Sequence, residues 1–136
     1  MARVRQRDSS PEMIVRRALH RSGFRYRLHA KDLPGSPDIV FPSRRLAVFV
    51  HGCFWHRHHG CKAATNPKTR QEFWHAKFER NVERDVEAIT RLEQMGWRTH
   101  VVWECEAKSG VGAEKLLEAL RRMSCLLDSR TTRRPR

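Results

Sequence analysis

Apolar residues recur at the spacing of an amphipathic helix in three segments of the chain. The first helix is expected within residues 9–23, where Gly23 supplies a stop signal. The second is expected over residues 71–95, with a break near Asn81, and the third around residues 116–123. Much of the apolar stripe of the second helix is expected to consist of Val82, Ile89, Leu92 and Met95.

Shorter apolar segments between these helices have the character of β-strands. Residues 24–29, which end with His29, alternate apolar and basic side chains, which is the period of a strand with one face in water. Residues 38–41 and 46–50 are mostly apolar runs joined by a turn, and they predict a buried hairpin; residues 97–103 predict a further buried strand. The order α, three strands, α, strand, α indicates a single α/β domain with a central mixed β-sheet flanked by helices.

The length and charge of the chain narrow the class of protein. Its 136 residues suit one domain, and its formal net charge is +13. We expect a domain at residues 9–127, preceded by a flexible basic arm (1–8) and followed by a basic disordered tail (128–136). Such a charge favours a polyphosphate partner, and a basic membrane-surface protein is the competing explanation. With neither a signal-peptide pattern nor a membrane-spanning apolar run, we expect a cytosolic protein.

The most informative stretch follows the strand at 46–50. Two cysteines, four histidines and two large aromatic side chains fall within residues 50–61. Loops at strand ends often carry function. In a reducing compartment, cysteines among histidines indicate a metal site rather than disulfides.

Three sulfurs and one nitrogen form a common closed ligand set for structural zinc. The candidate ligands are Cys53, His58, Cys61 and Cys105. Spacing does not decide among His56, His58 and His59 as the nitrogen ligand. The alternative is that Cys105 is a small buried apolar residue beside a loop that is merely rich in histidine. Cys125 falls in the apolar pattern of the last helix and is expected in the core.

Hydrolysis of a phosphodiester needs a cation on the phosphate, a base for the water, and a proton or metal for the leaving oxygen. Asp38, at the start of its strand, is a magnesium ligand by type, with a turn or capping role as the alternative. His51 and His56 are candidates for the general base. A base needs an orienting carboxylate, and Asp85 is a candidate, although its surroundings favour an ordinary solvated helix face.

Aromatic side chains near basic residues can stack on bases or wedge between base pairs. Phe54 and Trp55 lie in a polar loop, which favours stacking over core packing for this pair. Trp74, at the start of the second helix, fits either role. Trp97 and Trp103 lie in a strand pattern and are expected in the core.

Six short motifs occur in order along the chain. They are Leu33-Pro34-Gly35-Ser36-Pro37-Asp38, His51-Gly52-Cys53-Phe54-Trp55-His56, Glu72-Phe73-Trp74, Asn81-Val82-Glu83-Arg84-Asp85, Gly96-Trp97-Arg98 and Trp103-Glu104-Cys105. Together they resemble the Vsr family, the very-short-patch-repair endonucleases that nick DNA at T:G mismatches. The resemblance covers roughly residues 9–106 in order, and the agreement of several motifs makes it specific.

The resemblance implies a fold related to the PD-(D/E)xK restriction-endonuclease-like nucleases, with a structural zinc and a catalytic magnesium. Asp38 matches the magnesium-binding aspartate of the family. Val50 matches a position that is often threonine and whose backbone carbonyl reaches the metal, and a carbonyl survives that change of side chain. Glu12 matches a glutamate near the waters bound to the metal.

The resemblance also assigns the remaining site residues. His56 matches the proposed general base, Asp85 the acid that orients it, and His51 a histidine at the scissile phosphate. The zinc ligands of the family match Cys53, His58, Cys61 and Cys105. The aromatic residues inserted beside the mismatch match Phe54, Trp55 and Trp74, and the basic segment carrying Arg3, Arg5 and Arg7 would lie in the minor groove.

The sequence departs from the wider pattern in two places. The Glu-x-Lys half-motif of the superfamily is absent, with Phe49 and His51 in that region. Because histidine lacks the permanent charge of lysine, phosphate stabilisation is expected to depend on pH. Gly60 lengthens the spacing between the loop cysteines, so the choice between His58 and His59 stays open.

The resulting hypothesis is a magnesium-dependent, strand-specific endonuclease that nicks double-stranded DNA 5′ of the T in T:G mismatches made by deamination of 5-methylcytosine. We expect it to act as a monomer in the bacterial cytoplasm, at the nucleoid, with mismatch-repair proteins as further candidate partners. Two rivals are a restriction-type, sequence-specific nuclease of the same fold and a noncatalytic zinc DNA-binding module. The flanking bases recognised are not evident from the sequence.

Overall fold

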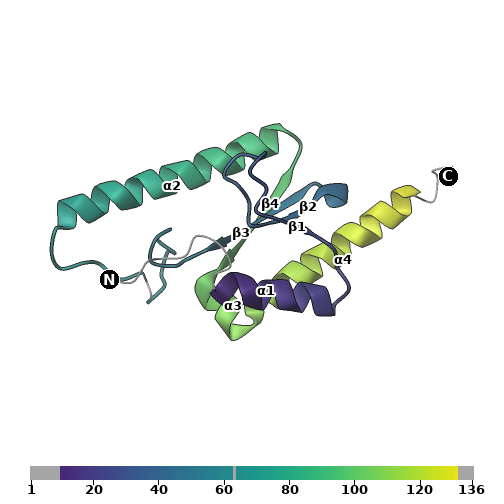
Figure 1. The fold of residues 1–136 in the computed structure, drawn as a ribbon, viewed down its shortest axis with the longest axis horizontal. Helices are drawn as coiled ribbons and strands as arrows, with labels where there is room; N and C mark the ends of the chain where they lie inside the picture. The colour runs from purple at the N-terminus through teal and green to yellow at the C-terminus, as the bar shows by residue number, and fades with distance from the viewer. Residues whose placement is uncertain (1–9, 63, 132–136) are drawn as a thin grey trace.

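The computed structural model describes residues 10–62 and 64–131, with side chains described as far as residue 123. Its elements are α1 (Ser10–Arg21), β1 (Arg27–Leu28), β2 (Ile39–Phe41), the 3-10 turn η1 (Pro42–Arg44), β3 (Leu46–His51), α2 (Gln71–Gln94), β4 (Arg98–Trp103), α3 (Glu104–Ser109) and α4 (Val111–Thr131), as drawn in Figure 1. In the part of the chain so described, no helix has the length and apolar character needed to span a bilayer.

The strands form one mixed sheet in the order β1-β2-β3-β4. β1 pairs with β2, and β2 with β3, in antiparallel fashion, while β3 pairs with β4 in parallel. The parallel pair needs a crossover, and α2 provides it. The prediction of a mixed sheet containing a buried hairpin is therefore confirmed.

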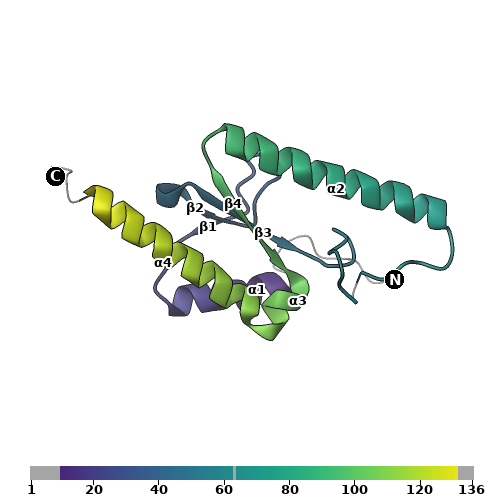
Figure 2. The same cartoon turned by 180° about the vertical axis from the view of Figure 1, so that it is seen from behind.

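Helices cover both faces of the sheet, with α2 on one face and α1, α3 and α4 on the other (Figures 1 and 2). Successive side chains of β3 serve the two layers alternately. Val48 packs in a core cluster with residues of α1 and α4, whereas Ala47 and Phe49 pack with residues of α2. Because both faces are buried, this strand reads in the sequence as one continuous apolar run.

Three predicted elements differ in extent from the structure. β1 contains only Arg27–Leu28, so most of the alternating segment at 24–29 is not strand. α2 continues through Asn81 without a break. α4 reaches Thr131 and so extends into the segment 128–136, for which we expected disorder; residues 132–136 lie outside the described residues. The short helix α3 was not predicted, because six residues are too few to display a helical period.

The apolar stripe of α2 is only partly as predicted. Leu92 is fully buried, but Val82 and Met95 are 39% and 49% exposed. In Figure 1 the N-terminal half of α2, which includes Val82, extends beyond the edge of the sheet, whereas Met95 is the C-cap residue that follows the helix. The N-terminal half packs through Phe78 on the loop that follows β3, and only the C-terminal half packs on the strands. Trp97, expected in the core, is only partly buried against the second cluster.

Gly35 gives a test of how tightly the loop before β2 is packed. Its φ is +75°, and a Cβ there would lie 2.6 Å from Cβ of Ala88 and 3.1 Å from the ring of Phe49. Gly23 has a similar φ of +85° with nothing within 4 Å of such a Cβ. Gly23→Ala and Gly35→Ala should each lose about 1–2 kcal/mol of unfolding free energy to backbone strain. Gly35→Ala should lose about 1–3 kcal/mol more, because its new Cβ overpacks the site. Urea unfolding measures both; equal losses would contradict this close packing.

Candidate active site and metal centres

The parallel pairing of β3 with β4 determines where the candidate residues meet. Its last register pair joins His51 to Trp103, so both strands end at the same edge of the sheet. The loop at 52–61 leaves β3 at that edge, and Cys105 follows β4 there. Residues about fifty positions apart in the sequence therefore become neighbours.

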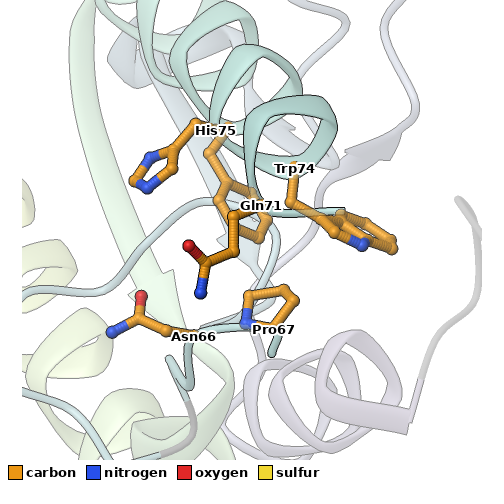
Figure 3. A pocket seen from close by; sticks show the side chains of 6 residues that line it. Asn66, Pro67, Gln71, Trp74 and His75 are labelled. Carbon is orange, nitrogen blue, oxygen red and sulfur yellow. The ribbon is translucent and has the colours of Figure 1, made fainter. Parts of the chain in front are cut away.

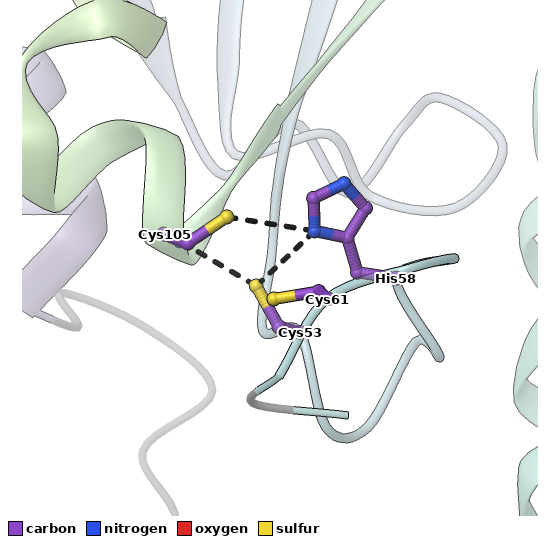
Figure 4. A group of neighbouring side chains, drawn as sticks. All are labelled: Cys53, His58, Cys61 and Cys105. Atoms are coloured by element: carbon purple, nitrogen blue, oxygen red, sulfur yellow. Dashed lines mark hydrogen bonds between the residues drawn. The ribbon is translucent and has the colours of Figure 1, made fainter. Parts of the chain in front are cut away.

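Three cysteines and one histidine come together at this edge (Figure 4). Their ligand atoms all lie within 4.8 Å of one another. Nδ1 of His58 is 3.6 Å from Sγ of Cys53 and 3.5 Å from Sγ of Cys105. Tetrahedral zinc, with bonds of about 2.3 Å to sulfur and about 2.0–2.1 Å to nitrogen, separates such atoms by about 3.6 Å. Together with Cys61, these residues have the donor chemistry and spacing of a closed zinc site.

The structure brings His58, and not His59, to the three sulfurs. The imidazole of His58 stacks on the indole of Trp103, with ring centroids 4.2 Å apart and planes 8° from parallel. His59 is exposed to solvent. Trp103 is only partly buried, which corrects its expected place in the core: it supports the ring of a candidate metal ligand instead.

Cys53 is the buried centre of this cluster. It is 0% exposed, and its Sγ accepts a hydrogen bond from the backbone N–H of Cys105 at 3.4 Å. Burial raises the pKa of the Cys53 thiol to about 12, and neighbouring cysteines add to the rise. Without a cation this sulfur therefore keeps its proton, whereas zinc binding would release it and couple metal affinity to folding.

A second cluster joins His51, His56 and Asp85. Nδ1–H of His56 donates to Oδ2 of Asp85 at 2.6 Å, which leaves Nε2 of His56 available to accept a proton. The rings of His51 and His56 stack with centroids 4.0 Å apart. Asp85 is thus not part of an ordinary solvated helix face, as its local sequence favoured, because α2 passes beside the loop.

His51 is buried at the end of β3, with 6% of its surface exposed. Burial, together with the neighbouring imidazole of His56, lowers the pKa of His51 from 6.5 to about 4, although the carboxylate of Asp85 opposes the shift. At neutral pH the free protein therefore holds His51 as a neutral imidazole. It can donate or accept a hydrogen bond there, but it does not supply a fixed positive charge.

Asp38 immediately precedes β2 and contacts β3. Its Oδ2 accepts the backbone N–H of Val50 at 2.8 Å. Burial raises the pKa of Asp38 to about 6; the hydrogen bond from Val50 opposes this shift, and the negative charge of Glu12 adds to it. A buried carboxylate beside a second carboxylate is an environment that a divalent cation would stabilise.

Glu12 and His29 complete a third cluster with Asp38, their ligand atoms within 4.8 Å of one another. Glu12, in the first turn of α1, is 1% exposed, and its Oε2 lies 2.9 Å from Nε2 of His29. Sequence reasoning missed His29, which looked like one polar residue of an alternating segment. Its backbone has a φ of +48°, which is unusual for histidine, but this conformation is not visible in the sequence.

The predicted DNA-contacting aromatic residues pack on one another beside α2. The ring of Phe54 contacts those of Trp55, Trp74 and Phe78 at centroid distances of 5.1, 5.8 and 5.2 Å. Phe54, Trp55 and Trp74 are partly exposed, so their rings can both pack on one another and stack on bases. Beside Trp74 lies a pocket of about 230 Å³, shown in Figure 3 and lined by Asn66, Pro67, Gln71, Trp74, His75 and Phe78.

Arg57, which sequence reasoning also missed, ties this aromatic loop together. Its guanidinium lies 4.1 Å from the ring centroid of Phe78. It donates hydrogen bonds to the backbone carbonyls of Phe54, Ala64 and Thr65. Of the other predictions, Arg3, Arg5 and Arg7 and the side chain of Cys125 lie outside the described residues.

Comparison with known proteins identifies relatives that cover most of the chain. The family model described as DNA mismatch endonuclease Vsr matches residues 1–63. The chain is 54% identical to the type II nicking enzyme V.XorIIP of Xanthomonas oryzae pv. oryzae, covering 83% of this chain and 82% of the relative. It is 42% identical to the DNA mismatch endonuclease Vsr of Escherichia coli, covering 87% and 73%, and 42% identical to the type II nicking enzyme V.NmeAIP of Neisseria meningitidis, covering 80% and 77%.

If zinc holds the Cys53 cluster together, its removal should cost folding free energy. We expect His58→Asn to lose the bound metal and to lower Tm by at least about 10 °C, whereas His59→Asn, one residue away and exposed, keeps both. Metal content and thermal unfolding of the two variants measure this. Chelated wild-type protein that retained its Tm would rule out a structural metal.

The depressed pKa of His51 predicts a loss of stability in acid. The unfolded histidine binds a proton below pH 6.5, but the folded one only near 4, so this stabilisation is complete above 6.5 and is lost as the pH falls toward 4. The full effect on the free energy of unfolding is about 3 kcal/mol. As the pH falls from about 7 to 5, the free energy of unfolding of His51→Gln should decrease by about 1–2 kcal/mol less than that of the wild type. Urea unfolding at the two pH values measures this. His59→Gln is the control and should follow the wild type.

Proposed function

Because the chain belongs to the Vsr family of DNA endonucleases, we propose that it nicks double-stranded DNA 5′ of the T in T:G mismatches. Such mismatches arise by deamination of 5-methylcytosine, and a nick there would start very short patch repair. The observation that carries the proposal is the convergence of a histidine–carboxylate pair and a buried aspartate at one edge of the sheet. These are the parts that hydrolysis of a phosphodiester needs.

The carboxylate side of the site suits Mg²⁺. Asp38 would hold the ion together with the backbone carbonyl of Val50, and Glu12 would accept hydrogen bonds from its waters. Buried oxygen donors with room for retained waters are the usual surroundings of this ion in nucleases. When bound, Mg²⁺ neutralises charge on the scissile phosphate and on the leaving oxygen.

His56 would act as the general base toward the attacking water. The hydrogen bond from its Nδ1–H to Asp85 fixes the tautomer and directs Nε2 away from the carboxylate. As a proton arrives on Nε2, the negative charge of Asp85 stabilises the imidazolium that forms. His51, stacked on His56, would donate a hydrogen bond to the phosphate or assist the leaving group from its neutral state.

Recognition of the mismatch would rest on wedging and on charge. Phe54, Trp55 and Trp74 present partly exposed rings on one surface, suited to insertion beside a base pair from the major groove. A T:G wobble opens at lower cost than a Watson–Crick pair, so deformation energy would contribute to selection. The basic segment carrying Arg3, Arg5 and Arg7 would bind in the minor groove, and the net charge of +13 supplies attraction for phosphates.

The mixed sheet, with its candidate residues at one edge, is compatible with a PD-(D/E)xK-like fold, and the Cys53 cluster with structural Zn²⁺. We propose that the protein acts as a monomer in the cytoplasm at the nucleoid, alongside mismatch-repair proteins.

A nicking assay on end-labelled duplexes with Mg²⁺ tests the function. One duplex carries a T:G mismatch in a methylation-site context and the other carries T:A. The wild type should place a single nick in the T strand of the mismatch only. Asp38→Asn should reduce the rate by at least about 100-fold, and Asp85→Asn by about 100- to 10,000-fold, through loss of the metal ligand and of base orientation respectively.

Asp32→Asn is the matched control, because Asp32 lies in the loop just before Asp38 and pairs only with exposed Arg27 among the described contacts. Its rate should equal that of the wild type. Cutting of both duplexes would favour the restriction-type nuclease. Tight mismatch binding without cutting, unaffected by Asp38→Asn, would leave a noncatalytic zinc module.

A further inference from the structure

His29 lies beside Asp38 at the open end of the β1–β2 ladder. The antiparallel register pairs Arg27 with Val40 and Leu28 with Ile39, so His29 comes next to Asp38. The backbone N–H of His29 donates to the carbonyl oxygen of Asp38 at 2.9 Å, which fixes this neighbourhood. An imidazole is thereby placed by sheet pairing next to the carboxylate assigned to the catalytic metal.

The imidazole of His29 also faces a second carboxylate. Its Nε2 lies 2.9 Å from Oε2 of Glu12, which is almost completely buried, and the side chain of His29 is itself only 17% exposed. Nη1 of Arg16 approaches the same oxygen of Glu12 at 3.4 Å and helps to hold it in place. One ligand atom from each of Glu12, His29 and Asp38 lies within 4.8 Å of the others.

The backbone of His29 adopts a conformation that histidine seldom takes. Its φ of +48° is in the left-handed region, which costs a residue with a Cβ roughly 1–2 kcal/mol. Strain of this kind is retained where the surrounding structure imposes it, often at functional sites. With this backbone, Nε2 of His29 lies 2.9 Å from Oε2 of Glu12, and only 17% of the side chain is exposed to solvent.

The distances suit two adjacent ligands of one ion. Neighbouring ligands of an octahedral cation, with bonds of about 2.1 Å, lie about 3 Å apart. The separation of 2.9 Å between His29 Nε2 and Glu12 Oε2 therefore serves either a hydrogen bond or joint coordination without rearrangement. Two carboxylates with one imidazole are a ligand set for Mn²⁺, Fe²⁺ or Co²⁺, whereas Mg²⁺ takes oxygen donors.

We propose that His29 is a direct nitrogen ligand of the divalent ion held by Asp38, with Glu12 coordinating Mn²⁺ directly rather than through its waters. This nitrogen ligand makes the centre bind Mn²⁺ more tightly than Mg²⁺. The inference rests on the proposed function, since it concerns the metal of the same site. It adds a side chain to that site and assigns it a preference for transition ions. Mg²⁺ would still bind through the oxygen donors, without the bond to nitrogen.

Binding of Mn²⁺ to the zinc-loaded protein tests this without DNA. Pulsed electron paramagnetic resonance of the Mn²⁺ complex should show coupling to a ¹⁴N nucleus, and competition should show Mn²⁺ bound at least about tenfold more tightly than Mg²⁺. His29→Gln should abolish the nitrogen coupling and weaken Mn²⁺ binding by at least about tenfold, with a much smaller effect on Mg²⁺. Glutamine keeps a donor for Glu12, so a mere hydrogen-bonding role would survive the change.

Two further variants make the result specific. His56→Gln removes the imidazole of the neighbouring cluster and should leave the nitrogen coupling intact, whereas Asp38→Asn should weaken Mn²⁺ binding. Nitrogen coupling that persists in His29→Gln, equal affinity for the two ions, or a wild type that binds no Mn²⁺ would each overturn the inference. Absence of mismatch nicking with these binding results intact would instead refute the proposed function alone.

Discussion

The parallel pairing of β3 with β4 is the contact on which the rest of the site depends. Parallel strands end at the same edge of a sheet, and the crossover through α2 is what allows the pairing. One consequence is that Cys105 reaches the loop cysteines from a distant part of the chain. The other is that α2, held against the sheet by its C-terminal half, carries Asp85 past His56. A shift of this register would separate Cys105 from the loop cysteines and Asp85 from His56 at the same time.

The site contains buried groups whose charged forms a metal ion would stabilise. The Cys53 thiol and the Asp38 carboxyl are both held in surroundings that disfavour their charged forms, and a metal ion would reverse that preference at each place. Burial likewise disfavours the charged form of His51, which lowers its pKa and keeps it a neutral imidazole. Within a small region the protein thus separates residues suited to bind cations from a histidine suited to hydrogen bonding.

The aromatic surface is organised by contacts that do not require DNA. Arg57 binds the carbonyls of the loop, and the side chain of Asn81 donates to the carbonyl of Trp55 at 3.2 Å. These contacts attach the loop to the half of α2 that extends beyond the sheet (Figure 1). Rings that are already ordered lose less conformational freedom on binding, which favours a wedge that acts as a rigid body.

Much of the fold was predictable because hydrophobic period and turn residues act locally. The sequence indicated the order of the main helices and strands, the hairpin, and a loop rich in metal-binding side chains. It could not show that α3 forms, nor that Val82 and Met95 are exposed, because a helix period reveals neither how far a helix extends past its sheet nor where the helix ends.

The sequence by itself determined which chemical groups are present and the family to which they belong. Only the tertiary structure decided which of several equivalent groups meet. His58 and His59 are adjacent and alike, yet one faces the sulfurs and the other faces solvent. Asp85 resembles any helix-surface acid, and His29 any polar strand residue, until packing places each beside its partner. Local sequence carries residue type and period, whereas distances between remote residues arise from strand register and helix packing.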